Sequence, residues 1–349
     1  GFLLFMNTNF DKPFKTYDEQ IEIIKSRNIK IEDPVFARNV LSSISYYAII
    51  NGYKNSFLLS QETESFVDGT SFEDLYTLHW LDTSLSNLLF KYILYIEQSL
   101  KTKISYLVSS NYGVFTPVEN IFDSIEYDYL SEQHYSNRRG KRQSVLQKLK
   151  FSITSRRNNE SVNHYLHTKN HIPPWIMITN IPFGLAIEWY GILKEDDKAN
   201  ICNQFIYPNP SASQLLSQDA KEFFRKALML LREYRNKIAH GHRIFTVNSS
   251  IELPKRPLFV LCNSAVSSSE YTHGMGRNDL YAILLSLYIL INDRYYLSNF
   301  ISELHSLLDP YKNKTINGKT VFEIFSFPEN LFERLDSLIA DKVYYLLIQ

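Results

Sequence analysis

The sequence is poor in the residues that break helices. Of its 349 residues, 11 are glycine and 12 are proline, roughly half the usual share of these two residue types. Few glycines and prolines mean few tight turns, so the composition favours long helices over a many-stranded sandwich. We therefore expect an all-α protein.

Cysteine and long apolar runs are scarce as well. Cys202 and Cys262 are too few and too widely spaced for a disulfide framework or a four-ligand zinc site, so we expect free core thiols in a reducing, cytoplasmic compartment. The longest apolar run, 281–291, is interrupted by Ser286 and falls well short of the ~20 residues that a membrane span needs. We expect no membrane partner.

Motifs for cofactors and metals are also missing. The sequence has no G-x-G-x-x-G, H-E-x-x-H, G-x-S-x-G or C-x-x-C. Glu160, His164, His167 and His171 have a spacing that could bind a metal on one helix, but Pro173 should end that helix near His171. We predict no cofactor and no metal site.

The formal net charge of +0 conceals a local separation of charge. Lys plus Arg and Asp plus Glu both number 37, which excludes a uniformly basic coat for nucleic acid. Acidic residues gather at 119–132 and basic residues at 138–157. We interpret the basic segment as an RNA-backbone surface, with Tyr135 and Phe151 available for base stacking. The alternative is a solvated face, or one neutralised by the acidic segment. The predicted RNA contacts are Arg138, Arg139, Lys141, Arg142, Lys148, Lys150, Arg156, Arg157 and His164.

Apolar spacing and capping residues divide the chain into helices. We expect an N-terminal helical unit at 1–65 and a larger helical domain at 66–349, with the basic segment as an insertion. A small β insertion is expected near 244–262. The expected helices begin at Thr16, at Asp33-Pro34 (to about 50) and at Ser71 (to about 113), and then cover 142–154, 160–169, 184–199, 218–240, 279–297, 298–308 and 328–347.

The sharpest local pattern lies at the end of the helix expected at 218–240. Arg232, Arg235, Asn236 and His240 fall within ~140° of arc on the side opposite its apolar face. Arginine supplies a fork of donors for phosphate oxygens, and histidine can act as a general acid or base. The pattern suits phosphate chemistry. The alternative is that these side chains are only solvent-exposed polar residues at a helix end.

Glu97 is the second candidate. It lies among apolar residues of the helix expected from Ser71, and a half-buried carboxylate needs a partner. It could orient Arg235 or His240, or form an ordinary structural ion pair.

Five stretches, in this order, resemble the Abi-like (AbiD/AbiF) family of bacterial phage-resistance proteins, which belongs to the HEPN superfamily. The resemblance covers roughly residues 12–345. The stretches are Lys12-Pro13-Phe14 with 19–27, Ile44-Ser45-Tyr46-Tyr47 with Asn51-Gly52-Tyr53, Ile96-Glu97, Pro173-Pro174-Trp175 with Phe183-Gly184, and R-N-K-I-A-H-G-H-R-I-F at 235–245.

The resemblance implies a HEPN-like multi-helix bundle that works as a homodimer and cleaves RNA without a metal. The RNA's own 2′-OH would be the nucleophile, leaving a 2′,3′-cyclic phosphate and a 5′-OH. His240 would transfer protons, Arg235 would neutralise charge on phosphorus, and Asn236 would position the phosphate or the imidazole. The supporting residues would be Glu97, Arg232, His242 and Arg243.

We therefore predict a phage-defence ribonuclease or toxin whose partner is cellular RNA, phage RNA or a small noncoding regulatory RNA. One histidine cannot easily serve as both acid and base, so two copies meeting across a two-fold axis would supply both. The main alternative is a non-catalytic RNA-binding or phage-sensing protein. A metal-dependent nuclease is a weaker third possibility.

Overall fold

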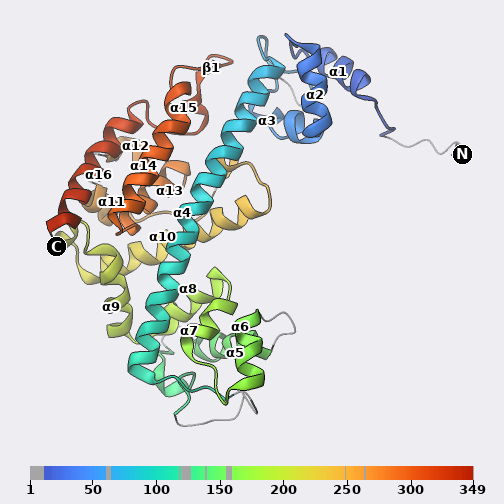
Figure 1. Cartoon of the computed structure of the whole chain (residues 1–349). Helices are drawn as coiled ribbons and strands as arrows, with labels where there is room; N and C mark the ends of the chain where they lie inside the picture. The colour runs from blue at the N-terminus through green and yellow to red at the C-terminus, as the bar shows by residue number, and fades with distance from the viewer. Residues whose placement is uncertain are drawn as a thin grey trace, which may run out of the picture. The chain divides into compact units, whose positions relative to one another are not determined.

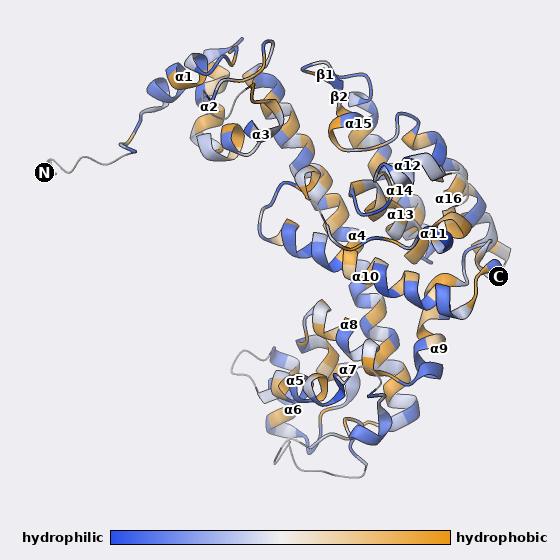
Figure 2. Ribbon diagram, turned by 180° about the vertical axis from the view of Figure 1, so that it is seen from behind, coloured by the Kyte–Doolittle hydropathy of each residue, from blue (hydrophilic) through white to orange (hydrophobic). Residues whose placement is uncertain are grey.

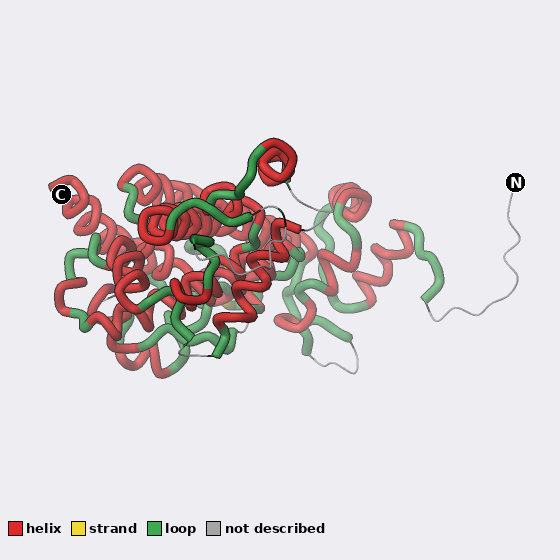
Figure 3. Tube along the Cα trace, turned by 90° about the horizontal axis from the view of Figure 1, so that it is seen from below, coloured by secondary structure: helices red, strands yellow, loops and turns green. Residues whose placement is uncertain are grey.

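The computed structural model describes residues 12–59, 64–117, 119, 127–137, 140–154, 159–247, 249–262 and 265–348. Over these residues it confirms the all-α class, because helices and loops account for all but one short hairpin (Figures 1 and 3). The hairpin pairs β1 (Thr315–Ile316) with β2 (Lys319–Thr320). Asn317 and Gly318 both have positive φ, as a tight two-residue hairpin turn requires.

The chain divides into two compact units, which differ from the expected division at 65/66. The first comprises Gly1–Ser84 with Pro310–Val321, and the second comprises Leu85–Asp309 with Phe322–Gln349. The helices up to the boundary are α1 (Tyr17–Ser26), α2 (Pro34–Ser43), the π-helical turn η1 (Tyr47–Asn51), α3 (Lys54–Phe57) and α4 (Phe72–Tyr112), within which the boundary falls.

The helices that follow are η2 (Glu132–His134), α5 (Arg142–Thr154), α6 (Glu160–Thr168), α7 (Pro174–Met177), η3 (Ile178–Asn180), α8 (Phe183–Ile192), α9 (Glu195–Ile206), η4 (Ala212–Gln214), α10 (Ser217–Ala239), η5 (Ile244–Thr246), α11 (Lys255–Cys262), α12 (Ser268–Thr272), α13 (Leu280–Leu290), α14 (Arg294–Leu308), η7 (Asp309–Tyr311), α15 (Val321–Ile324) and α16 (Leu331–Ile348).

The predicted capping residues begin the N-terminal helices. Thr16 and Glu19 form a complete capping box at α1, and the Asp33 side chain accepts from the first amides of α2. The second helix is shorter than expected, since Ile44 adopts an extended conformation and ends it at Ser43. The region from Ser71 forms one continuous helix of 41 residues, close to the expected extent.

Three other predictions of secondary structure were wrong. The helix expected at 184–199 is interrupted at Leu193, which ends α8, and at Lys194, which is extended and precedes α9. The break expected at 297/298 lies earlier, because the side chain of Asp293 caps the first amides of α14. The expected β insertion at 244–262 is instead η5 and α11 over the described residues, and the only described strands are at 315–320.

The core of the second unit is organised around α10 and α13. The apolar face of α10 packs against α8, α9, α11 and α13, which fixes its orientation within the unit. Figure 2 shows the resulting alternation of hydrophobic and hydrophilic residues along α10. All eleven residues of α13 are buried. Lys342 is buried as well, and its Nζ donates to the carbonyls of Tyr288 (2.7 Å) and Ile289 (2.8 Å), which lie at the C-terminal end of α13.

Among the described residues, no helix is both long and apolar enough to cross a bilayer. Cys202 and Cys262 are free and buried, as predicted, and burial raises the pKa of both thiols.

Candidate active site

The end of α10 is fixed by its own backbone hydrogen bonds. Gly241 donates to the carbonyl of Ile238 at 2.9 Å, and His242 donates to the carbonyl of Lys237 at 3.0 Å. This is the Schellman arrangement, in which Gly241 takes the left-handed conformation (φ +72°) that a residue with a side chain would adopt at a cost. His240 is thereby held as the C-cap residue of α10.

Three of the predicted site residues lie together beside this helix end. Oε2 of Glu97 lies 3.6 Å from Nε of Arg235, and Oε1 of Glu97 lies 2.7 Å from Nζ of Lys101. Nη1 of Arg235 is 3.4 Å from Oδ1 of Asn236, and its guanidinium lies over the ring of Phe90. The side chain of Glu97 is only 9% exposed and that of Arg235 is 30% exposed. A buried carboxylate therefore contacts a partly exposed guanidinium.

The remaining predicted residues of the helix end are more exposed. His240 and His242 are exposed, and their imidazoles make no hydrogen bond or ion pair within the described part of the chain. Arg232 is exposed and lies against Gly184 of α8, where a Cβ would come within 2.9 Å of its Nε. Arg243 is half-buried. The structure thus brings Glu97, Arg235 and Asn236 into contact and leaves His240 open at the end of the helix.

This arrangement has the parts of a phosphate site. The guanidinium is held from one side by Glu97 and Phe90, which leaves other N–H groups to donate to a phosphate oxygen. An exposed imidazole five residues further along the chain could accept or donate a proton.

The basic segment is less available to RNA than its composition suggested. Arg138, Arg139, Arg156 and Arg157 lie outside the described residues. The other predicted contacts there are largely engaged by carboxylates: Arg142 with Glu132 (2.5 Å), Lys148 with Glu188 (2.7 Å) and Lys150 with Asp128 (3.3 Å).

Two of those carboxylates, Asp128 and Glu132, come from the acidic segment, so it neutralises part of the basic one. The interpretation of Tyr135 as a stacking residue was wrong, since its ring is only 3% exposed. Its hydroxyl accepts from Nε1 of Trp189 and donates to the carbonyl of Tyr129, so the residue belongs to the core. Phe151 is 59% exposed.

His164 is exposed on α6, and Thr168 donates to its carbonyl. α6 ends at Thr168, so His171 is not on the same helix as His164. Within the described residues there is no group of three or more His, Cys, Asp or Glu side chains placed to hold a metal ion.

A groove of about 630 Å³ lies alongside α10, and sequence reasoning missed it. We call it the α10 groove; residues of α5, α8, α9 and α10 line it. Two of its lining arginines, Arg225 and Arg232, are seven residues apart on the polar face of α10. That spacing is a signal that the sequence contained, because residues at i and i+7 share a helix face.

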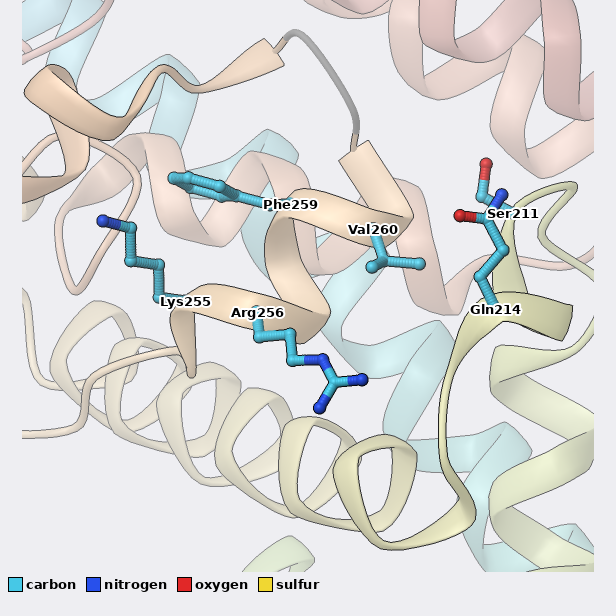
Figure 4. A pocket seen from close by; sticks show the side chains of 6 residues that line it. All are labelled: Ser211, Gln214, Lys255, Arg256, Phe259 and Val260. Atoms are coloured by element: carbon cyan, nitrogen blue, oxygen red, sulfur yellow. The ribbon is translucent and has the colours of Figure 1, made fainter.

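A second cavity, of about 610 Å³, lies at α11 (Figure 4). It is lined by Lys255, Arg256 and Phe259 of α11 and by Ser211 and Gln214 from the connection before α10 (Figure 4). Its two cations are engaged, because Arg256 lies 3.3 Å from Asp219 and Lys255 donates to Ser268 at 2.7 Å. None of the predicted site residues lines it.

Comparison with known protein families identifies the family of the chain. A family model described as Abi-like protein matches residues 39–246. This range covers more than half of the chain and includes Glu97 and the whole of α10. No curated protein and no solved structure matches the chain.

Proposed function

Because the chain belongs to the Abi-like protein family, whose members serve abortive-infection defence against phage, we propose that it cleaves RNA at the end of α10. The observation that carries this proposal is the contact of Glu97 with Arg235, five residues before the exposed His240 at the end of the same helix. We assign the reaction to the HEPN type of ribonuclease, which needs no metal ion.

The reaction would exchange one P–O bond of the RNA for another. The 2′-oxygen of the RNA attacks the adjacent phosphorus, the 2′-O–P bond forms, and the P–O5′ bond breaks. A base takes the proton of the 2′-OH, and an acid gives a proton to the leaving 5′-oxygen, which yields a 2′,3′-cyclic phosphate and a 5′-OH. His240 fills one of these two roles, and general acid–base help of this kind contributes about 10²- to 10⁴-fold.

Arg235 would stabilise the negative charge that builds up on the phosphoryl oxygens. A donor held in place before the reaction does this without being reorganised during it. Glu97 supplies that positioning from a buried site on α4, and Asn236 lies within reach of the same guanidinium. Glu97 is therefore a positioning residue, whereas Arg235 and His240 touch the reacting groups.

The second proton-transfer group would come from another copy of the chain. The exposure of His240 suits such a homodimer, because an imidazole at a helix end is open to a neighbouring molecule. A purified protein that is monomeric at working concentration and fully active on RNA would contradict the shared site.

The test compares wild type with His240→Ala on total cellular RNA in the presence of EDTA. We expect wild type to leave cyclic phosphate ends and the variant to lose this activity by about 10²-fold or more. His273→Ala is the matched control, because His273 is also an exposed helix C-cap residue, on α12. Equal cleavage by wild type and His240→Ala would refute the catalytic assignment, and loss of activity in EDTA would favour a metal-dependent nuclease.

A non-catalytic RNA-binding or phage-sensing protein is the second candidate. It is favoured by the same exposure of His240, whose ring contacts neither Arg235 nor Glu97 in any hydrogen bond or ion pair of the described residues. Under this alternative His240→Ala would keep both RNA affinity and phage protection.

A further inference from the structure

We infer that the α10 groove binds the backbone of single-stranded RNA and leads it to His240, an inference that rests on the proposed function. The groove lies in the second unit and has a volume of about 630 Å³. Its α10 wall includes Arg225, Met229 and Arg232.

The register of α10 connects the groove to the candidate active site. Arg225, Arg232, Asn236 and His240 follow one another at intervals of seven, four and four residues. At 100° per residue they lie within about 80° of arc, and at 1.5 Å per residue the stripe is about 22 Å long. A strand that lies along this wall therefore reaches His240 without leaving the face of one helix.

Most of the negative charge in the groove is already neutralised. Glu188 lies 2.7 Å from Lys148, and Glu195 lies 3.1 Å from Lys198 and 2.9 Å from Lys221. The hydrogen bond from Lys221 is the main cause that lowers the pKa of Glu195 to about 2. At neutral pH this carboxylate is therefore ionised and stays paired with the two lysines.

The cations that remain are available to a ligand. Lys141, Arg225 and Arg232 line the groove, and none of them has a carboxylate partner within the described residues. Arg225 donates only to the thioether of Met229, at 3.4 Å. Glu222 is the one remaining carboxylate of the lining, so three cations face one anion and the groove attracts phosphate.

The groove also has apolar lining residues, which suit unpaired bases. Val145, Ile187 and Met229 are among them; Val145 and Ile187 are buried, and Met229 is half-buried. Single-strand sites combine cations that follow the backbone with apolar or aromatic surface for the bases, whereas a duplex keeps its bases paired and stacked inside. A groove lined by both unpaired cations and apolar side chains therefore fits single-stranded RNA.

The test measures binding of a labelled 2′-O-methyl oligouridine of about 12 nucleotides, a length within the usual single-strand footprint. This probe cannot be cleaved through its 2′-oxygen, so binding is separated from catalysis. We expect Arg225→Gln and Arg232→Gln each to weaken binding about 3- to 10-fold, and each lost contact to reduce the slope of log affinity against log salt by about 0.7. Arg294→Gln, on α14 outside the groove, is the matched control with the same loss of charge.

The possible outcomes test the groove assignment separately from the ribonuclease assignment. If Arg225→Gln/Arg232→Gln binds the probe as wild type does, with an unchanged salt slope, the groove assignment is wrong even if the wild type cleaves RNA. If the double variant loses binding while wild type cleaves nothing, the groove assignment is supported and the ribonuclease fails. Equal affinity for an RNA duplex, or tighter binding of an oligoglutamate peptide, would overturn the assignment of single-stranded RNA as the ligand of the groove.

Discussion

Glu97 and Arg235 face each other at a distance slightly too long for a hydrogen bond. Oε2 of Glu97 lies 3.6 Å from Nε of Arg235, and neither atom has a hydrogen-bond partner among the described residues. The other oxygen of the carboxylate is bound to Lys101. Glu97 thus positions Arg235 by charge rather than by a closed hydrogen bond, which leaves N–H groups of the guanidinium available to a phosphate.

We expect Glu97→Gln to lower both stability and cleavage. It removes the negative charge between two cations that are only 17% and 30% exposed, and such a loss costs about 1–3 kcal/mol. Chemical denaturation measures the first effect and cleavage of RNA measures the second, where we expect a lower kcat because Arg235 is no longer held in place.

Glu233→Gln serves as the matched control for this prediction. Glu233 is also a half-buried carboxylate, bound to Lys237 at 2.8 Å and to Ser249 at 2.6 Å, and it lies on α10. We expect it to cost stability with little effect on kcat. If both variants reduce kcat equally, Glu97 has only a structural role.

Gly184→Ala tests whether the position of Arg232 depends on α8. A Cβ at Gly184 would lie 2.9 Å from Nε and 3.1 Å from Cζ of Arg232, so the arginine side chain must move. The long side chain can move at little cost, and alanine favours the helix by up to about 1 kcal/mol. We expect an unchanged or higher thermal midpoint together with weaker binding of the oligouridine probe.

Gly191→Ala is the control, because nothing lies within 4 Å of a Cβ at that position of α8. It lines the same groove without touching Arg232. Weaker binding in both variants would mean that the groove, rather than the arginine, responds to the added methyl group.

Stability at low pH should depend on Glu270. Both of its oxygens accept from Arg334, at 2.7 and 2.9 Å. These hydrogen bonds are the main cause that lowers the pKa of Glu270 from 4.5 to about 2. Because the folded value lies below the unfolded one, the stabilisation is present above pH 4.5 and is lost as the pH falls toward 2.

After allowance for solvent screening, the loss for Glu270 is on the order of 1 kcal/mol, measured as the free energy of unfolding in urea between pH 5 and 2. Glu270→Gln keeps the capping box with Ser267 and should show a smaller change over that range. An identical pH dependence in wild type and variant would contradict the assignment.

Asp279 should make the free energy of unfolding depend on pH in the opposite direction to Glu270. It caps α13 by accepting from the amide of Ala282 at 2.9 Å, and burial raises its pKa from 3.8 to about 6. Between about pH 4 and 6 the folded state therefore binds more protons than the unfolded state, and stability falls as the pH rises.

Asp279→Asn keeps a capping oxygen and removes this titration. We expect the free energy of unfolding of the variant to be flatter than that of wild type between pH 4 and 6, and no lower at pH 7. A variant that is clearly less stable at pH 7 would show that the ionised carboxylate stabilises the fold.

The sequence by itself determined the local features of this protein. The scarcity of glycine and proline gave the all-α class, and side chains such as those of Thr16 and Asp33 mark where helices begin because capping depends on neighbours within a few residues. The same holds for the C-cap at Gly241 and for the Arg/Asn/His cluster at the end of α10. The breaks at Leu193 and at Asp293 also have local signals, namely the acidic first turn at 195–197 and the capping side chain of Asp293, which the spacing of apolar residues alone does not show.

Only the tertiary structure decided which distant residues meet. The choice of Arg235 as the partner of Glu97, the burial of Tyr135 and the neutralisation of the basic segment by Asp128 and Glu132 all depend on contacts between different helices or loops. Net charge and periodicity describe one segment at a time, whereas a carboxylate from another segment can cancel a cation without any trace in the local pattern. The α10 groove arises in the same way, because its walls come from four helices that only packing brings together.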